Sequence, residues 1–186
     1  MTRLIFIRHG KTSGNLKGAY MGRTDEALCT EGKMELEEKS FPKADIVISS
    51  PMKRCVQTAN IIYPHMPIRI YNDLKECDFG DFEGKSYAEL NGNADYQAWI
   101  DSGGTMPFPN GESHKDFTDR CCRAFLQAVS ENEGKTIAFA VHGGTIMSVL
   151  ERFAVPKKGY YDYMIKNGCG FLTEFSDGII QIIGEI

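Results

Sequence analysis

Residues 4–10 read LIFIRHG, a short apolar run that ends in an arginine, a histidine and a glycine. Its first four residues are all apolar, which is typical of a strand that is buried on both faces of a sheet. Arg8, His9 and Gly10 follow directly. The stretch therefore predicts an interior strand that delivers an arginine and a histidine at its carboxyl end.

Two other apolar runs are followed by polar residues in the same way. Residues 45–48 (DIVI) lead into Ser-Ser-Pro and then, one turn later, Arg54. Residues 136–141 (TIAFAV) lead into His142 and Gly143. Ligands of open α/β sheets bind beyond the carboxyl ends of the strands. The three runs therefore predict one sheet edge that carries two arginines, two histidines and several glycines.

Helical and strand patterns alternate along the rest of the chain. The expected helices cover residues 30–39, 51–62, 113–131 and 143–153, and the further strands cover residues 68–71, 171–175 and 179–183. Thr30, Ser50 and Ser113 are the expected N-caps, and Pro51 suits the first position of its helix. Together these patterns predict an α/β fold, a three-layer α/β/α sandwich with a mixed, mostly parallel sheet.

The chain length predicts one domain. A chain of 186 residues fits a single domain with a real core, so we expect residues 1–186 to form one unit. The segment of about 78–111 is rich in glycine, asparagine and aromatic residues. We expect it to form a cap of loops and short helices over one end of the sheet.

The composition restricts the class of partner. The net charge of -4 argues against nucleic acid, so an anionic substrate needs a local basic pocket. The six cysteines form no Cys-x-x-Cys pair, and no Cys/His spacing suits zinc. No signal peptide and no membrane-spanning stretch is evident. We therefore expect a cytoplasmic monomer or homodimer with reduced thiols and no membrane partner.

The residues at the predicted sheet edge suit phosphoryl transfer. Arg8 and Arg54 can each present a planar fork to phosphate oxygens, and the helix that opens near Gly143 can aim N–H groups at an anion. A neutral imidazole is a competent nucleophile near pH 7. If a backbone carbonyl accepts the Nδ1 proton of His9, its Nε2 carries the free lone pair. His142, in protonated form, would then stabilise the equatorial oxygens.

A leaving alkoxide also needs a proton donor. Glu76 follows the strand expected at residues 68–71, lies at the same sheet edge, and can act as a general acid with a pKa raised by partial burial. Asp78 and Glu83 lie nearby in the sequence and are alternatives for this role.

Several stretches of the chain resemble the histidine phosphatase superfamily, which includes the phosphoglycerate mutases. They are LIFIRHG (4–10), SSPMKRCVQTA (49–59), ECDFGDFEG (76–84), PNGES (109–113) and VHGG (141–144). By this resemblance the catalytic residues are His9 as the phosphohistidine, Glu76 as the proton donor, and Arg8, Arg54 and His142 as the phosphate pocket. The implied substrate-binding residues are Asn15, Gly22 and Gly143. The resemblance implies no metal and no organic cofactor.

The sequence favours hydrolysis of a small phosphorylated metabolite over mutation. Members of the family that are mutases carry extra loop sequence around the acid segment, whereas residues 84–111 form a modest segment here, and a more open pocket favours water as the acceptor. Met21 stands where the mutase-related members have a threonine or serine. The amino-acid sequence around Glu76 is similar to that of the α-ribazole-5′-phosphate phosphatases of cobalamin assembly. It is also similar to that of broad-specificity members of the family.

Three alternatives stay open at this point. They are a phosphoglycerate mutase, a non-catalytic protein that binds a phospho-ligand, and a metallohydrolase that uses both histidines as ligands. The metallohydrolase lacks a paired carboxylate set, and two arginines would repel a divalent cation. Six aromatic residues can line an apolar wall for a leaving group or pack beneath the long loop: Tyr20, Phe82, Tyr87, Tyr96, Trp99 and Phe108.

Overall fold

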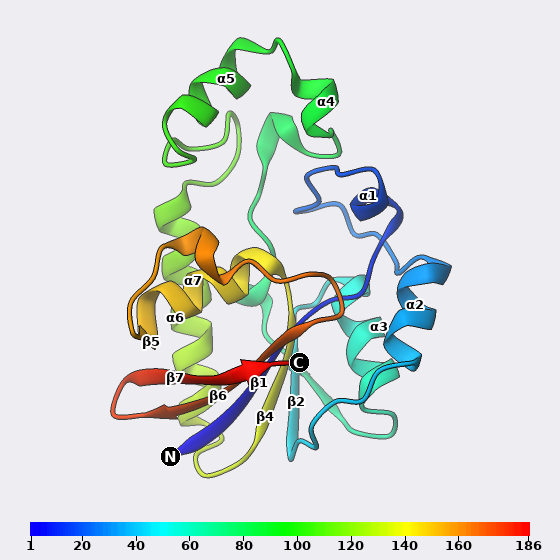
Figure 1. The fold of residues 1–186 in the computed structure, drawn as a ribbon, viewed down its shortest axis with the longest axis vertical. Helices are drawn as coiled ribbons and strands as arrows, with labels where there is room; N and C mark the ends of the chain where they lie inside the picture. Colours follow the sequence, from blue (N-terminus) through cyan, green and yellow to red (C-terminus); the bar gives the residue numbers. More distant parts are fainter.

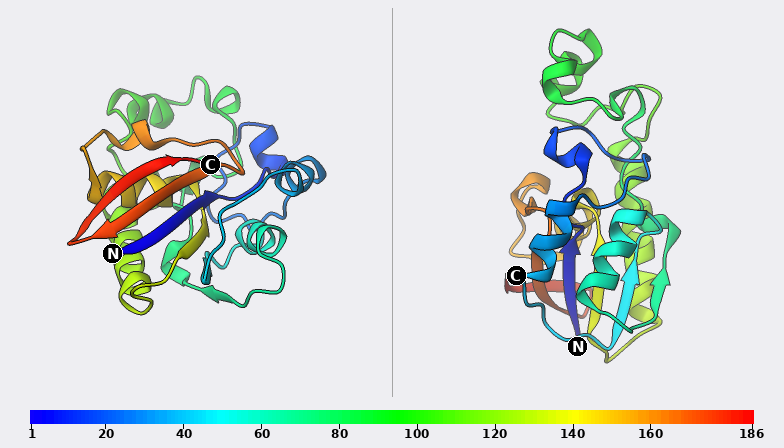
Figure 2. Two further views of the ribbon diagram at one scale, coloured as in Figure 1. Left: turned by 60° about the horizontal axis from the view of Figure 1, so that its bottom comes forward. Right: turned by 90° about the vertical axis from the view of Figure 1, so that its right-hand side faces the viewer.

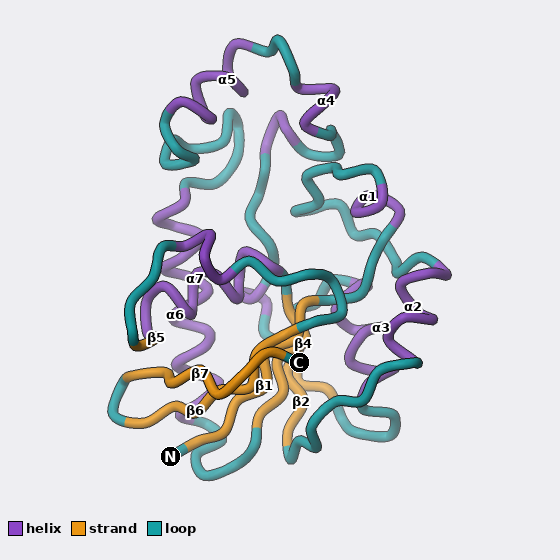
Figure 3. The backbone as a smooth tube through the Cα atoms, viewed as in Figure 1, coloured by secondary structure: helices purple, strands orange, loops and turns teal.

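The computed structural model describes all 186 residues and contains one seven-stranded sheet (Figures 1 and 3). The strands are β1 (Thr2–Arg8), β2 (Ile46–Ser49), β3 (Ile68–Ile70), β4 (Ile137–Val141), β5 (Ala154–Val155), β6 (Gly170–Ser176) and β7 (Ile179–Glu185). The α-helices are α1 (Ser13–Leu16), α2 (Thr30–Glu37), α3 (Lys53–Ile62), α4 (Tyr87–Leu90), α5 (Ala94–Asp101), α6 (His114–Ser130) and α7 (Gly143–Phe153). Three 3₁₀ helices complete the fold: η1 (Asn72–Leu74), η2 (Gly80–Phe82) and η3 (Tyr160–Tyr163).

The strand order is β3-β2-β4-β1-β6-β7-β5. Strands β1 to β4 are parallel to their neighbours among themselves, whereas β6 runs antiparallel to both β1 and β7. Helices α6 and α7 cover one face of the sheet, and α2 and α3 lie on the other side (Figure 1). The predicted three-layer sandwich with a mixed, mostly parallel sheet is therefore confirmed.

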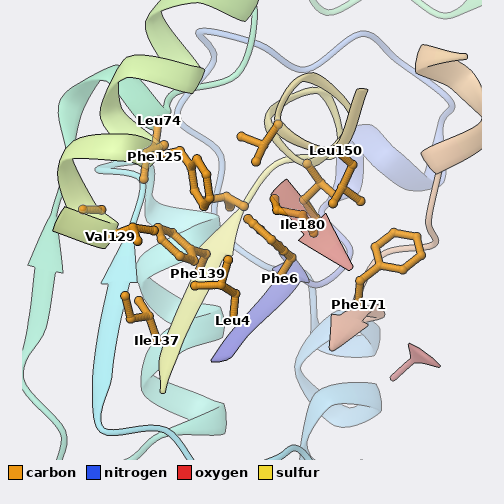
Figure 4. Packing of buried hydrophobic residues seen from close by; sticks show 14 of the residues in the cluster. Leu4, Phe6, Leu74, Phe125, Val129, Ile137, Phe139, Leu150, Phe171 and Ile180 are labelled. Atoms are coloured by element: carbon orange, nitrogen blue, oxygen red, sulfur yellow. The ribbon is translucent and has the colours of Figure 1, made fainter. Parts of the chain in front are cut away.

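The unbroken apolar run of β1 reflects burial on both faces. Leu4 and Phe6 belong to the larger core cluster beneath α6 and α7, where Phe6 stacks on Phe139 with ring centroids 5.3 Å apart (Figure 4). Ile5 and Ile7 point the other way, into the cluster that α3 covers. Alternate side chains of a strand lie on opposite faces, so a central strand between two helical layers needs apolar residues at every position.

Two of the three predicted N-caps are wrong. Cys29 caps α2, because its Sγ accepts the Gly32 N–H at 3.3 Å, and Thr30 is the first helical residue. Helix α3 begins only at Lys53, so Ser50 and Pro51 lie before it. The Ser50 hydroxyl instead contacts a histidine of the site, as described below. The prediction for α6 is confirmed, because Ser113 Oγ accepts the Asp116 N–H.

The segment between η1 and α6 lies beyond the carboxyl ends of the parallel strands. It holds η2, α4 and α5, and Figure 2 shows β1 and β2 pointing toward the end of the molecule that carries these helices. Helix α1 and strand β5 were not predicted, because stretches of four and two residues leave no periodic signal. All six cysteines are free thiols. None of the helices combines the length and the hydrophobicity that a membrane crossing requires.

Gly170→Ala is expected to destabilise the protein by ~1–3 kcal/mol, the usual cost of overpacking. Gly170 pairs with Ile7 across the junction of β1 and β6, and a Cβ there would lie 1.7 Å from the Phe6 carbonyl oxygen. Urea unfolding of the variant measures the loss. Gly184→Ala on β7 is the matched control, because its Cβ would meet no atom within 4 Å. Equal midpoints for the two variants would contradict this reading of the β1–β6 junction.

Candidate active site

The predicted site residues converge where β1, β4 and β2 end. Arg8 at the end of β1 is in register with Val141 at the end of β4, so the residues that follow lie side by side. The ring centroids of His9 and His142 are 5.2 Å apart, with an angle of 70° between the planes. Both rings and the Arg54 side chain are buried. The sheet topology therefore brings together groups that lie far apart in the sequence.

The backbone fixes the tautomer of His9. Its Nδ1 lies 2.7 Å from the Gly10 carbonyl oxygen, which can only accept, so Nδ1 donates and Nε2 keeps its lone pair. The Gly10 N–H donates to Thr58 Oγ1, and Asn167 Nδ2 donates to the His9 carbonyl. Burial, together with the positive charges of Arg54 and Arg8, lowers the pKa of His9 well below 6.5. The ring is therefore neutral at pH 7, with Nε2 available as a nucleophile.

His142 is also neutral in this structure. The ring is fully buried, its Nε2 lies 2.8 Å from Ser50 Oγ, and burial together with Arg54 lowers its pKa well below 6.5. The ring is therefore uncharged in the protein alone, and a protonated His142 stays a prediction for the complex with phosphate. The sequence places a histidine at the sheet edge but does not reveal how completely water is excluded there. A phosphate dianion beside the ring would favour the imidazolium, because an opposite charge raises a histidine pKa.

Backbone carbonyls hold both arginines. Arg8 Nη1 donates to the Ile165 carbonyl at 2.7 Å, and the two terminal nitrogens of Arg54 donate to three carbonyls of residues 21–24. The Nε atoms of both arginines are buried and have no partner in the protein. A buried donor without a partner costs ~1–3 kcal/mol. Phosphate oxygens would accept from both Nε groups and relieve this cost.

Glu76 is the only carboxylate that lines the cavity beside His9. Its Oε1 accepts the Cys77 N–H at 3.0 Å and its Oε2 accepts the Gly144 N–H at 3.1 Å. Burial raises its pKa above 4.5, and these two hydrogen bonds oppose the shift. A Cβ at position 144 would lie 2.2 Å from Glu76 Oε1, so only glycine allows this approach. The geometry suits a carboxyl group that exchanges a proton with a ligand.

The two alternative donors lie outside this cavity. Asp78 Oδ2 pairs with Arg23 Nε at 3.1 Å. Glu83 Oε1 accepts the N–H groups of Gly22 and Thr24 at 2.9 and 2.8 Å. The structure therefore separates three carboxyl groups that are close neighbours in the sequence.

The cavity has a volume of about 310 Å³, and 12 of its 20 lining residues are hydrophobic. Of the six aromatic residues named from the sequence, Tyr20, Trp99 and Phe108 line it. Phe82 and Tyr96 pack behind them, and Tyr87 is 70% exposed. The sequence analysis missed several further lining residues, among them His114, Met147, Tyr160, Tyr161 and Met164. The aromatic run 160–163 was the available signal for part of this wall.

Comparison with known proteins identifies the family. The model of the histidine phosphatase superfamily (branch 1) matches residues 4–183. The chain belongs to this superfamily.

Two curated members of the superfamily span nearly the whole chain. "Uncharacterized phosphatase PhoE" of Bacillus subtilis (strain 168) is 30% identical over 184 residues, which cover 95% of this chain and 90% of that protein. "Adenosylcobalamin/alpha-ribazole phosphatase" of Escherichia coli (strain K12) is 28% identical over 180 residues, which cover 90% and 87% of the two chains.

A solved structure shows how far the likeness extends in three dimensions. Phosphoserine phosphatase of Entamoeba histolytica in complex with 3-phosphoglyceric acid superimposes with a TM-score of 0.85 at 29% identity and covers 100% of this chain and 96% of that chain. The superfamily fold and the named phosphatases agree with the fold and the enzyme class expected from the sequence.

Asn15, Gly22 and Met21 differ in what they present to the cavity. Asn15 lines the cavity, and its Oδ1 accepts from Thr12, which leaves the Nδ2 group without a protein acceptor. The N–H of Gly22 is occupied by Glu83, so Gly22 presents no free N–H to the cavity. Met21 lines the cavity with an apolar side chain.

The two buried histidines predict a loss of stability in acid. Each has a folded-state pKa below its unfolded value, so the unfolded chain binds protons more strongly as the pH falls through 6.5. The free energy of unfolding is therefore highest above pH 6.5. It declines below that pH, by about 1 kcal/mol per histidine at pH 5.5. Urea unfolding at pH 7.5 and 5.5 measures the decline.

Variants of two histidines test this assignment. His142→Gln should lose about half of the histidine-dependent decline. His65→Gln, at an exposed position, should keep the full decline. An unchanged pH dependence in His142→Gln would show that the ring is not held neutral by burial.

Proposed function

We propose that this protein is a metal-independent phosphomonoesterase that transfers the phosphoryl group of a small-molecule phosphate to His9 and then to water. The observation that carries the proposal is the state of His9. Its Nδ1 proton is bound by the Gly10 carbonyl and its ring is neutral, beside two arginines whose Nε donors are free. A neutral nucleophile next to fixed positive charge is the combination that phosphoryl transfer requires.

The first step forms the phosphohistidine. The Nε2 lone pair of His9 attacks phosphorus, and the bond from phosphorus to the ester oxygen breaks. Glu76, in its protonated form, gives its proton to that oxygen, so the leaving group departs as an alcohol. The guanidinium groups of Arg8 and Arg54 bind the transferred oxygens, and the phosphate charge favours a proton on His142. Helix α7 begins at Gly143, so the Gly143 N–H and the positive end of the helix dipole would stabilise the same anion.

The second step releases phosphate. A water molecule attacks phosphorus while the Glu76 carboxylate takes one of its protons. The bond from phosphorus to Nε2 breaks, and the electron pair returns to the ring. His9 is then neutral and Glu76 is protonated again, so the enzyme is ready for another substrate.

The cavity supports an apolar or aromatic leaving group. Arg8 is the only lysine or arginine that lines it, and we assign its guanidinium to the phosphate, so the walls of this cavity offer a carboxylate on the leaving group no further lysine or arginine. This disfavours phosphoglycerate and hence a mutase reaction. Aromatic and methionine side chains on the walls would contact a flat heterocycle. We therefore rank α-ribazole 5′-phosphate first among the candidates, in keeping with the similarity to an adenosylcobalamin/alpha-ribazole phosphatase.

We further propose a cellular compartment and a substrate class for the enzyme. Its six free thiols support a reducing compartment, the cytoplasm, and its substrate is a small metabolite and neither a nucleic acid nor a membrane lipid.

Phosphate release by the wild type and by His9→Ala tests the proposed function. The substrates are p-nitrophenyl phosphate, α-ribazole 5′-phosphate, 3-phosphoglycerate and a few sugar phosphates. We expect release that falls at least 10³-fold in the variant, with the aromatic compounds ahead of 3-phosphoglycerate. Isomerisation of 3-phosphoglycerate without release would establish a mutase. Binding of phosphate without any reaction would establish a non-catalytic protein.

Glu76→Gln should separate substrates by their leaving groups. An alkoxide needs protonation more than p-nitrophenolate does, so we expect kcat to fall about 10²–10⁴-fold on alkyl phosphates and much less on p-nitrophenyl phosphate. Steady-state kinetics on both classes measure the difference. Asp78→Asn, whose parent carboxylate is paired with Arg23, is the matched control and should affect both classes alike. Equal losses on both classes in Glu76→Gln would remove Glu76 from the role of the acid.

A further inference from the structure

The orientation of Arg54 depends on a short loop and not on a paired carboxylate. Arg54 is fully buried and takes part in no ion pair. Its Nη1 donates to the Thr24 carbonyl at 2.7 Å, and its Nη2 donates to the carbonyls of Met21 and Gly22 at 3.1 and 2.8 Å. All three acceptors belong to residues 21–24, which form neither helix nor strand. These three carbonyls therefore help to define the position of the free Nε donor.

One side chain holds the loop from the other side. Glu83 Oε1 accepts the N–H groups of both Gly22 and Thr24, at 2.9 and 2.8 Å, although Glu83 lies about sixty residues away in the sequence. Gly22 also packs directly against the Cys77 carbonyl, since a Cβ at position 22 would lie 2.0 Å from that oxygen. Hydrogen bonds from backbone N–H groups to a carboxylate are stronger than those between neutral groups. The N–H side of the loop is thus held by Glu83 and its carbonyl side holds Arg54.

The side chain of Glu83 is separate from the backbone contacts that its segment makes. The backbone near Glu83 pairs with Tyr20, and the Gly84 N–H donates to the Tyr20 carbonyl at 2.8 Å. These contacts join the cap to the rest of the fold and do not use the carboxylate. The second carboxylate oxygen, Oε2, is buried and has no partner. Burial of an unpaired carboxylate oxygen costs free energy. The hydrogen bonds that the Glu83 side chain makes are those to the N–H groups of Gly22 and Thr24.

We propose that Glu83 is a positioning residue for Arg54 in the phosphate pocket. By holding the N–H groups of Gly22 and Thr24, it aligns the three carbonyls that orient the guanidinium and aim its free Nε at the phosphoryl oxygens. The inference rests on the proposed function, because it assigns Arg54 to phosphate binding. It adds a link from the cap segment to the chemistry at the sheet edge that does not pass through Glu76.

A double-mutant cycle tests the link. We expect Glu83→Ala to lower kcat/KM for p-nitrophenyl phosphate and to weaken inhibition by inorganic phosphate, each about 10–100-fold, and Arg54→Ala to cause a larger loss. Because Glu83 acts through Arg54, the double variant should match Arg54→Ala within about twofold. Losses that multiply would overturn the proposal.

Two conservative variants separate geometry from charge, and they also serve if Glu83→Ala fails to fold. Glu83→Gln keeps an oxygen at the length that reaches both N–H groups, so it should restore most of the activity. Glu83→Asp keeps the charge but is one methylene too short, so it should resemble Glu83→Ala. The reverse order would show a purely electrostatic effect and overturn the proposal. Asp81→Ala, an exposed change in the same segment, is the control and should match the wild type.

Calorimetric titration with inorganic phosphate distinguishes the two levels of inference. Weaker phosphate binding in both Arg54→Ala and Glu83→Ala supports the positioning role. Weaker binding in Arg54→Ala alone would overturn that role and leave the proposed function intact. A wild type that neither binds phosphate nor hydrolyses any ester would overturn both.

Discussion

The hydrogen bond from His9 Nδ1 to the Gly10 carbonyl is the contact on which the site depends, because it decides which ring nitrogen can react. Gly10 is itself held by α3, because its N–H donates to Thr58 Oγ1, so strand end and helix together position the residue whose carbonyl orients the ring. Histidines of this kind are often oriented by a carboxylate, which would also raise the pKa. Here a neutral acceptor orients the ring, and burial beside Arg54 keeps it uncharged. In the proposed reaction His9 would therefore attack without any prior proton transfer.

Neutral acceptors also hold the positively charged groups of the site. Neither Arg8 nor Arg54 is neutralised by a carboxylate ion pair, since carbonyls of loops hold both guanidinium groups. Carbonyl dipoles orient a guanidinium but leave its full charge to act on an incoming anion. As a consequence, the buried Nε donors of the two arginines have no hydrogen-bond partner in the protein. Electrostatic preorganisation of this kind costs stability in the free protein and is recovered when the anion binds.

The sequence predicted the parts of the site that follow from strand ends. Each buried run is marked by its apolar residues, and topology alone then places His9, His142 and Arg54 together. It could not predict contacts that depend on exact distances: the use of Ser50 by His142 and not by α3, or the separation of Glu76 from Asp78 and Glu83. It also missed the wall formed by residues 160–164, because a 3₁₀ helix of four residues is too short to show a periodicity.

The cavity takes its two functions from different kinds of structure. The side of the cavity that carries Arg8, His9 and Gly143 is built from strand ends and helix starts, whereas the other walls come from segments that are separate in the chain, such as 19–21, 99–108 and 160–164. Loops tolerate substitution and insertion far better than the sheet that they surround. A change in leaving-group preference therefore needs no change in the catalytic residues. This separation makes the scaffold readily evolvable: duplicated copies can diverge toward new phosphate esters while they inherit an intact reaction.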